Sequence, residues 1–150
     1  MFFLKELPTR RMLETYAARY PGMEAGTVGD ALRLLRRASL LLRELDAYFS
    51  AHGLSQSRFL VLVVIDREPE ATGLLASVIA DRLDISRPVV TETVKALTQA
   101  GLLTSVPDPD DGRARRIALT TRGQAVLADR LPGYFALIAE FMGRADEPTA

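Results

Sequence analysis

The sequence predicts a mainly α protein with one small β-hairpin. Three observations lead to this fold class. Apolar residues recur at helical spacing over most of the chain, two helices within 75–100 meet at a tight turn, and an alternating strand pair with an arginine-rich tip follows within 102–120. A helix, a turn, a helix and a hairpin in this order predict a winged helix-turn-helix, here joined to a helical dimerisation region.

Residues 1–26 are predicted to form an extension with one short helix. Thr9 follows Pro8 as an N-cap, and Pro21-Gly22 ends the helix near Tyr20. Two interpretations stay open for its apolar stripe: it lies across a partner subunit, or it packs on its own chain. The stripe consists of Met12, Leu13, Tyr16, Ala17 and Tyr20.

Residues 27–52 are predicted to form one long helix. Thr27 to Asp30 has the spacing of a capping box, and His52-Gly53 ends the helix after about Ala51. A stripe this wide exceeds what one neighbouring helix covers, so we expect a second copy of the chain to cover it; the alternative is a central helix within one subunit. The stripe has two rows spaced by seven, Leu34/Leu41/Tyr48 and Leu35/Leu42/Phe49.

Residues 53–120 are predicted to form the winged helix-turn-helix lobe. Residues 54–57 cap a core helix from Arg58 to about Ile65, and a support helix with Leu75, Ile79 and Leu83 on one face follows. Asp84 tolerates the left-handed conformation that a sharp turn between helices requires. Ser86 is a preferred N-cap for the second helix, and Pro88 fits its first turn.

The second helix is predicted to expose a polar face. Thr91 has only modest helix propensity on an outward face, whereas its hydroxyl and methyl groups suit a base edge or a phosphate. The alternative is an ordinary solvated face. Apolar spacing buries Val90, Thr93, Val94 and Leu97, which leaves Arg87, Pro88, Thr91, Glu92 and Lys95 outside.

The hairpin is predicted to run from a strand at Leu102–Val106, stopped by Pro107, to a return strand that ends before Thr120 or Thr121 caps the next helix. Residues 108–112 are turn formers throughout. On the return strand, Ile117 and Leu119 share one face and Arg116 and Ala118 the other. The arginines after the tip are Arg113, Arg115 and Arg116, which are either a basic contact surface or ordinary strand residues.

Residues 121–150 are predicted to form two apolar helices and a polar, frayed tail from Arg144 onward. The helices span Thr121–Arg130 and Leu131–Gly143 and join near Pro132-Gly133. We expect them to pair with the long helix in dimerisation.

Composition limits the function. The 150 residues carry zero formal net charge, so a basic surface must be local. The chain has no Cys and one His, which excludes thiol redox chemistry and a histidine metal cluster. We found no phosphate loop, nucleophile elbow or metalloprotease motif, so neither an enzyme nor a cofactor is expected. No signal peptide or membrane helix begins the chain, which predicts a soluble cytoplasmic protein without membrane partners.

The hairpin resembles that of the MarR family of winged helix-turn-helix transcription regulators. That family has an Asp-x-Arg-x-x-x-aliphatic-x-Leu-Thr signature, matched here by Asp111, Arg113, Ile117, Leu119 and Thr120. The resemblance implies that Arg113 enters a minor groove while Asp111 holds the wing. It also implies that the helix from Ser86 lies in a major groove. Many members are basic where this chain has Glu92, which cannot bind phosphate.

The resemblance also implies a small aromatic or phenolic effector, bound between the dimerisation helices and the DNA-binding lobe. Tyr48, His52 and Phe59 are aromatic and lie near that predicted junction, although plain core packing is the alternative for each. The expected function is a homodimeric, sequence-specific transcription regulator, a repressor, on roughly palindromic double-stranded DNA. The alternative is a winged-helix module that binds protein, which the zero net charge and Glu92 would permit.

Overall fold

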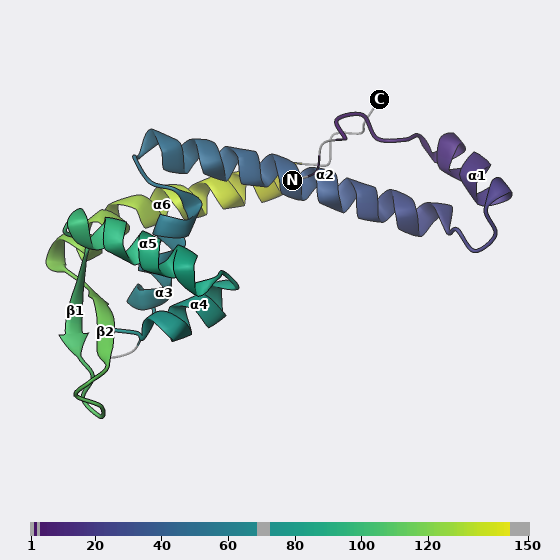
Figure 1. Ribbon diagram of the computed structural model, residues 1–150. Coiled ribbons are helices and arrows are strands. Elements are labelled where there is room, and N and C mark those ends of the chain that lie inside the picture. Colours follow the sequence, from purple (N-terminus) through teal and green to yellow (C-terminus); the bar gives the residue numbers. More distant parts are fainter. Residues whose placement is uncertain (1, 3, 69–72, 145–150) are drawn as a thin grey trace. The chain divides into compact units, whose positions relative to one another are not determined.

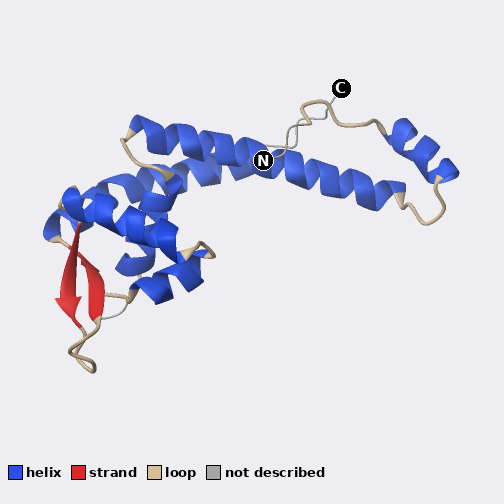
Figure 2. Cartoon of the chain, viewed as in Figure 1, coloured by secondary structure: helices blue, strands red, loops and turns tan. Residues whose placement is uncertain are grey.

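The computed structural model describes residue 2, residues 4–68 and residues 73–144 (Figures 1 and 2). Its helices and a two-stranded antiparallel hairpin confirm the predicted fold class, mainly α with a small β wing. Within the described ranges, no helix is both long and apolar enough to span a membrane. In chain order the elements are α1 (Arg10–Arg19), α2 (Ala25–Ala51), α3 (Gln56–Asp66), α4 (Ala76–Leu83), α5 (Arg87–Gln99), β1 (Leu103–Pro107), β2 (Arg115–Leu119) and α6 (Thr121–Gly143).

The chain divides into two compact units. The helical unit comprises Met1–Leu45 and Leu137–Ala150, and the winged unit comprises Asp46–Ala136. The boundaries fall inside α2 and α6, so each of these long helices contributes one part to each unit.

Local hydrogen-bonding rules place several helix ends where the sequence predicts them. The Thr9 hydroxyl accepts from the backbone N–H of Met12 at 3.3 Å, and Ser55 does the same for Arg58 at 3.3 Å. Asp84 has φ 50° and ψ 45°, the left-handed conformation expected between α4 and α5. These observations confirm the cap at Thr9 and the turn of the helix-turn-helix, whereas α3 begins at Gln56, two residues before the predicted start at Arg58.

The predicted capping box at Thr27 is wrong, because α2 begins at Ala25. The backbone N–H of Val28 donates to the Glu24 carbonyl at 3.0 Å, so Thr27 already lies inside the helix. A side-chain cap at Thr27 has no helix start to satisfy, since the first helical hydrogen bond forms upstream of it.

The predicted break near Pro132 is also wrong, because α6 is one helix through Gly143. Gly133 lies against Tyr48, where an added Cβ would come within 2.7 Å of the Tyr48 hydroxyl oxygen. That hydroxyl donates to the Arg130 carbonyl at 2.7 Å. Packing against α2 thus supports the helix at the point where Pro132 lacks an N–H.

The first strand of the hairpin extends one residue further toward the tip than predicted, and β2 has a second pairing partner at Ile117. Its register runs from Leu103 opposite Leu119 to Pro107 opposite Arg115, so the strand begins after Leu102 and includes Pro107. Leu74 forms an isolated antiparallel bridge with Ile117 on the free edge of β2, with N–O distances of 2.9 and 2.7 Å.

This bridge changes the burial of the return strand. Ile117 and Ala118 are both 8% exposed, whereas alternation predicted Ala118 on the exposed face with Arg116. Gly73 packs against the strand with φ +74°, and an added Cβ there would meet the Ile117 carbonyl oxygen at 2.6 Å. The segment that precedes α4 therefore covers a face that the sequence pattern left open.

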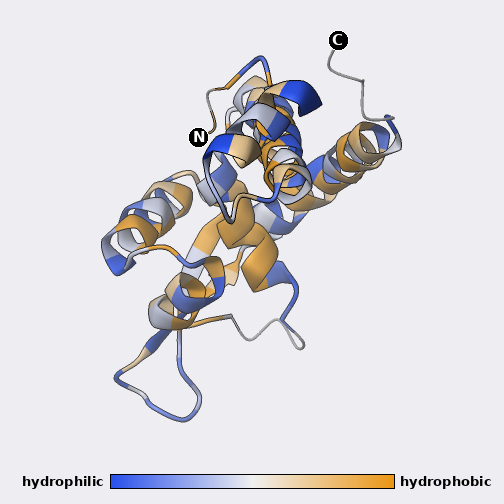
Figure 3. Ribbon diagram, turned by 90° about the vertical axis from the view of Figure 1, so that its right-hand side faces the viewer, coloured by the Kyte–Doolittle hydropathy of each residue, from blue (hydrophilic) through white to orange (hydrophobic). Residues whose placement is uncertain are grey.

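The core of the winged unit is formed mainly by α3, whose ribbon is coloured as hydrophobic in Figure 3. Phe59 is 0% exposed, with its ring centroid 4.9 Å from those of Phe49 and Tyr134. Gly123 allows the first turn of α6 to approach the Leu102 carbonyl, where a Cβ would clash. α5 and the hairpin are thus held on one common core.

The helical unit buries few side chains of its own. Leu13, Leu45 and Phe141 are 6–7% exposed. Arg144, predicted to begin a frayed tail, instead makes two hydrogen bonds to the Glu44 carboxylate at 2.6 and 3.0 Å. The rest of the predicted tail, residues 145–150, lies outside the described residues. Several leucines of α2 remain in solvent: Leu34 is 70% exposed, Leu35 49% and Leu42 44%.

Candidate nucleic-acid interface

The outward face of α5 is as the apolar spacing predicts. Val90 and Leu97 are buried at 0% and 2% exposure, and Thr93 is also buried. Within the described part of the chain, no hydrogen bond or ion pair engages the side chain of Arg87, Glu92 or Lys95. The residues predicted to lie outside, Arg87, Pro88, Thr91, Glu92 and Lys95, are all exposed.

Two details of α5 differ from expectation. Ser86 is the N-cap by position, but its side chain makes no capping hydrogen bond, so its hydroxyl is available to a ligand. The Thr91 hydroxyl donates to the Arg87 carbonyl at 3.0 Å, which leaves its oxygen lone pairs and its methyl group directed outward. Val89, which the sequence analysis did not assign to this face, is 45% exposed and adds an apolar side chain to the first turn.

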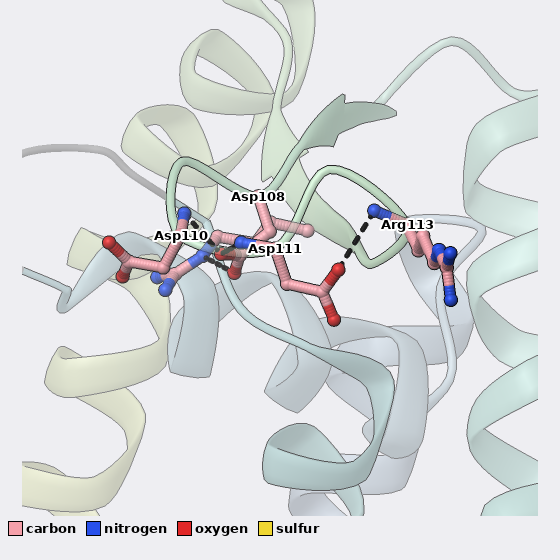
Figure 4. Close-up of polar contacts among 5 residues, drawn as sticks. Asp108, Asp110, Asp111 and Arg113 are labelled. Atoms are coloured by element: carbon pink, nitrogen blue, oxygen red, sulfur yellow. Dashed lines mark hydrogen bonds and ion pairs between the residues drawn. The ribbon is translucent and has the colours of Figure 1, made fainter.

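The wing loop between β1 and β2 is held by its own hydrogen bonds and is coloured as hydrophilic in Figure 3. The Asp111 carboxylate accepts from the backbone N–H of Arg113 at 2.9 Å. Figure 4 shows the Arg113 side chain extending away from Asp111, so Asp111 holds the wing through this backbone hydrogen bond and not through a contact with the Arg113 side chain. Asp111 therefore fixes the backbone of the turn and leaves the guanidinium outside.

Asp108 is the wing residue that the sequence analysis missed. It is 8% exposed, and its Oδ1 accepts the backbone N–H groups of Asp110 at 2.8 Å and Asp111 at 3.0 Å (Figure 4). Its Oδ2 accepts from Arg116 Nε at 2.5 Å. These contacts, led by the Arg116 hydrogen bond, lower the pKa of Asp108 below its ordinary value. Three aspartates within four positions gave no local signal for which one would be buried.

The three wing arginines therefore have different surroundings. Arg116 is paired with Asp108, and Arg115 donates from Nε to the Ser105 hydroxyl at 3.0 Å and from its terminal nitrogen to the Ser105 carbonyl at 2.8 Å. Arg113 is exposed, and no side-chain partner for it exists among the described residues. Only one of the three guanidinium groups is thus presented at the loop without an internal contact.

The three candidate effector residues lie in an aromatic cluster of the winged unit. Phe59 is fully buried, so in this conformation its ring offers no surface to a ligand. Tyr48 and His52 are half-buried, with ring centroids 4.4 Å apart. His52 Nδ1 lies 2.7 Å from the Tyr48 carbonyl, and since a carbonyl only accepts, Nδ1 carries the proton. Among the described residues, no group of three or more His, Asp or Glu side chains could hold a metal ion.

A family model described as the MarR family matches residues 52–114, from the end of α2 through the wing loop. This part of the chain is therefore similar to the MarR family. The chain is 27% identical to the HTH-type transcriptional repressor YetL of Bacillus subtilis over 139 residues, which are 93% of this chain and 83% of YetL.

Two solved structures have the same fold as this chain. The M. tuberculosis transcriptional regulator MosR in complex with DNA is 26% identical, with a TM-score of 0.60 over 75% of this chain and 79% of MosR. CouR from Rhodococcus jostii RHA1 bound to p-coumaroyl-CoA is 24% identical, with a TM-score of 0.68 over 77% of this chain and 80% of CouR. The family model covers α3, α4, α5, β1 and the wing loop, and ends before β2.

Proposed function

We propose that this protein is a homodimeric, sequence-specific DNA-binding transcription regulator that acts as a repressor. One observation carries the proposal: a single compact unit presents the polar face of α5 together with a preformed wing whose Arg113 side chain has no partner among the described residues. The DNA-bound state of MosR and the repressor function of YetL support it. We propose a cytoplasmic protein without catalytic activity.

The binding mode follows from the chemistry of the two surfaces. α5 enters a major groove, where Arg87, Thr91 and Lys95 meet base edges and phosphates and the Ser86 hydroxyl and Pro88 lie at the backbone. Arg113 enters the adjacent minor groove and Arg115 adds positive charge beside the phosphates, whereas the charge of Arg116 is offset by Asp108. Glu92 either repels phosphate or accepts a hydrogen bond from a cytosine amine.

The two long helices supply the dimer. The exposed leucines of α2 and the apolar surface of α6 pair with a second copy, so these helices form the dimerisation region, residues 53–120 the DNA-binding lobe and residues 1–26 an extension. In α1, Met12, Tyr16 and Tyr20 are at least half exposed, which favours a strap across the partner over packing on the same chain. Two reading helices about 34 Å apart then match a roughly palindromic operator.

A small aromatic or phenolic effector acting through the region of Tyr48, His52 and Phe59 is a further part of the proposal. The bound p-coumaroyl-CoA of CouR supports this ligand class. Because Phe59 is fully buried, binding in contact with its ring requires that the aromatic cluster opens. Calorimetric titration with phenolic acids, compared between wild type and Tyr48→Leu, tests this part.

Arg113→Ala tests the DNA-binding function. We expect affinity for DNA from the protein's own upstream region to fall by about 1–3 kcal/mol, and the salt dependence to flatten by about one phosphate contact. Arg43→Ala in α2 is the matched control, since it removes the same charge from an exposed position in the helical unit. Both variants should melt like wild type. If wild type binds no DNA at low salt, or if Arg113→Ala leaves affinity and slope unchanged, a protein-binding module becomes the better reading.

A further inference from the structure

The wing contains one carboxylate that is almost completely enclosed. The Asp108 side chain is 7% exposed although it belongs to a surface loop, whereas Asp110 and Asp111 are exposed. Each Asp108 oxygen has a partner: Oδ1 accepts two backbone N–H groups, and Oδ2 accepts from Arg116. An enclosed carboxylate with this many donors is an organising group of the loop rather than a solvated turn residue.

The backbone around Asp108 closes into a ring. The Asp108 N–H donates to the Ala114 carbonyl at 3.1 Å, and the Ala114 N–H donates to the Asp111 carbonyl at 2.9 Å. The Asp108 carboxylate bonds the turn from the inside of this ring, and Asp111 bonds the N–H of Arg113. The Arg113 side chain therefore projects from a backbone that is already ordered before any ligand binds.

We propose that Asp108 is a positioning residue for DNA binding, which orders the loop that presents Arg113 and withholds Arg116 from the phosphates. The inference rests on the proposed DNA-binding function. A preordered arginine loses less conformational entropy when it enters a narrow groove. Arg116, held by an internal carboxylate, contributes less attraction for phosphate than an unpaired arginine does.

The charge of Asp108 gives this proposal a test based on sign. The Arg116 hydrogen bond and the two backbone N–H groups lower the Asp108 pKa, so the carboxylate is ionised at neutral pH. If only long-range electrostatics mattered, removing a negative charge next to DNA would raise affinity. If positioning matters more, Asp108→Asn lowers affinity although the wing becomes more positive.

The experiment measures DNA affinity and its salt slope for Asp108→Asn and for the matched control Asp110→Asn. Both variants remove one carboxylate from the same loop, but only the Asp108 side chain bonds the turn. We expect roughly a tenfold loss of affinity for Asp108→Asn, which is a partial loss of one arginine contact, and no loss for Asp110→Asn. Unchanged or raised affinity for Asp108→Asn would overturn the proposal.

A double-mutant cycle with Arg113→Ala separates positioning from general damage. Asp108→Asn should weaken binding in wild type and should not weaken it further once Arg113 is absent. An equal loss in both backgrounds would overturn the proposal, because Asp108 would then act on something other than Arg113. Thermal melting should change little.

Arg116→Lys provides a second route if Asp108→Asn does not fold. It keeps the charge but cannot reproduce the Nε hydrogen bond to Asp108, so positioning predicts a smaller loss in the same direction and electrostatics alone predicts none. Wild-type affinity for Arg116→Lys would overturn the proposal in that case. Absence of DNA binding by wild type would instead refute the underlying function, which keeps the two failures distinct.

Discussion

The helical unit and the winged unit distribute their apolar residues in opposite ways. All of the largest fully buried side chains of the described chain belong to the winged unit: Phe49, Phe59, Leu62, Ile79, Leu97, Leu103, Leu127, Val61 and Val90. Of the large apolar side chains that are exposed, most belong to the helical unit: Leu4, Met12, Tyr16, Tyr20, Leu34, Leu35, Leu40, Leu42 and Met142.

The winged unit folds around its own apolar core, whereas the helical unit leaves much of its apolar surface exposed. The apolar rows of α2 illustrate this within one helix, since Leu35 and Leu42 are exposed in the helical unit and Phe49, in the same row, is 1% exposed in the winged unit. In the proposed dimer a second copy covers the exposed leucines, whereas the exposed Arg and Lys of α5 are proposed to meet the charged DNA.

The largest expected effect is on the interior of the winged unit. Phe59→Ala should lower the free energy of unfolding by about 3–5 kcal/mol, because it opens a cavity between Phe49 and Tyr134. Phe59→Leu, which keeps more of the volume, should cost less. Chemical denaturation followed by circular dichroism measures both. A loss below about 0.5 kcal/mol for Phe59→Ala, the scale of a surface change, would contradict the core assignment.

The next effect is on association through the helical unit. Leu34→Glu should weaken dimerisation by about 3 kcal/mol or more, because one leucine is lost from each of two subunits, while the single chain tolerates a charge at a 70% exposed position. Light scattering at micromolar concentration should show a dimer for wild type and a monomer mass for Leu34→Glu.

Arg43→Glu is the control for that experiment, because Arg43 lies nine residues further along α2, on the opposite side of the helix. It should remain a dimer. A monomeric wild type would show that the exposed leucines serve another partner, and the geometry of two half-sites would fail with it.

The smallest effect is on the polar exterior of the winged unit. Glu92→Gln should raise DNA affinity for all sequences by about 0.5–1 kcal/mol, the scale of one screened charge pair. Electrophoretic retention on specific and unrelated DNA measures it. Weaker specific binding with unchanged non-specific binding would show instead that Glu92 accepts a hydrogen bond from a cytosine.

Sequence reasoning succeeded where the physical cause is local. A hydroxyl next to the free N–H groups of a helix start identified Thr9 and Ser55, and the tolerance of Asp for positive φ identified Asp84. The outward face of α5 followed from helical periodicity alone. The faces of the hairpin followed from strand alternation, up to the point where Leu74 pairs with β2.

Sequence reasoning failed where the local structure depends on contacts with a segment distant in the sequence. Pro132 has a local rule that predicts a break, but the contact of Gly133 with Tyr48 supports one continuous helix. Leu74 pairs with β2 through a single bridge, and one paired residue is too short a strand to show alternation in the sequence. Asp108 is enclosed because Arg116 returns opposite it in the hairpin, and no rule for turn residues separates it from Asp110 or Asp111.

The bridge between Leu74 and Ile117 has a mechanical consequence. The chain enters α4 from a residue paired to one edge of β2 and leaves α5 into β1, paired to the other edge. The segment before α4 and the strand after α5 are thus both hydrogen-bonded to β2. The wing and α5 therefore cannot separate without breaking backbone hydrogen bonds. In the proposed dimer, an effector that releases DNA is therefore expected to change the distance between the two winged units along the duplex, rather than to move the wing away from α5.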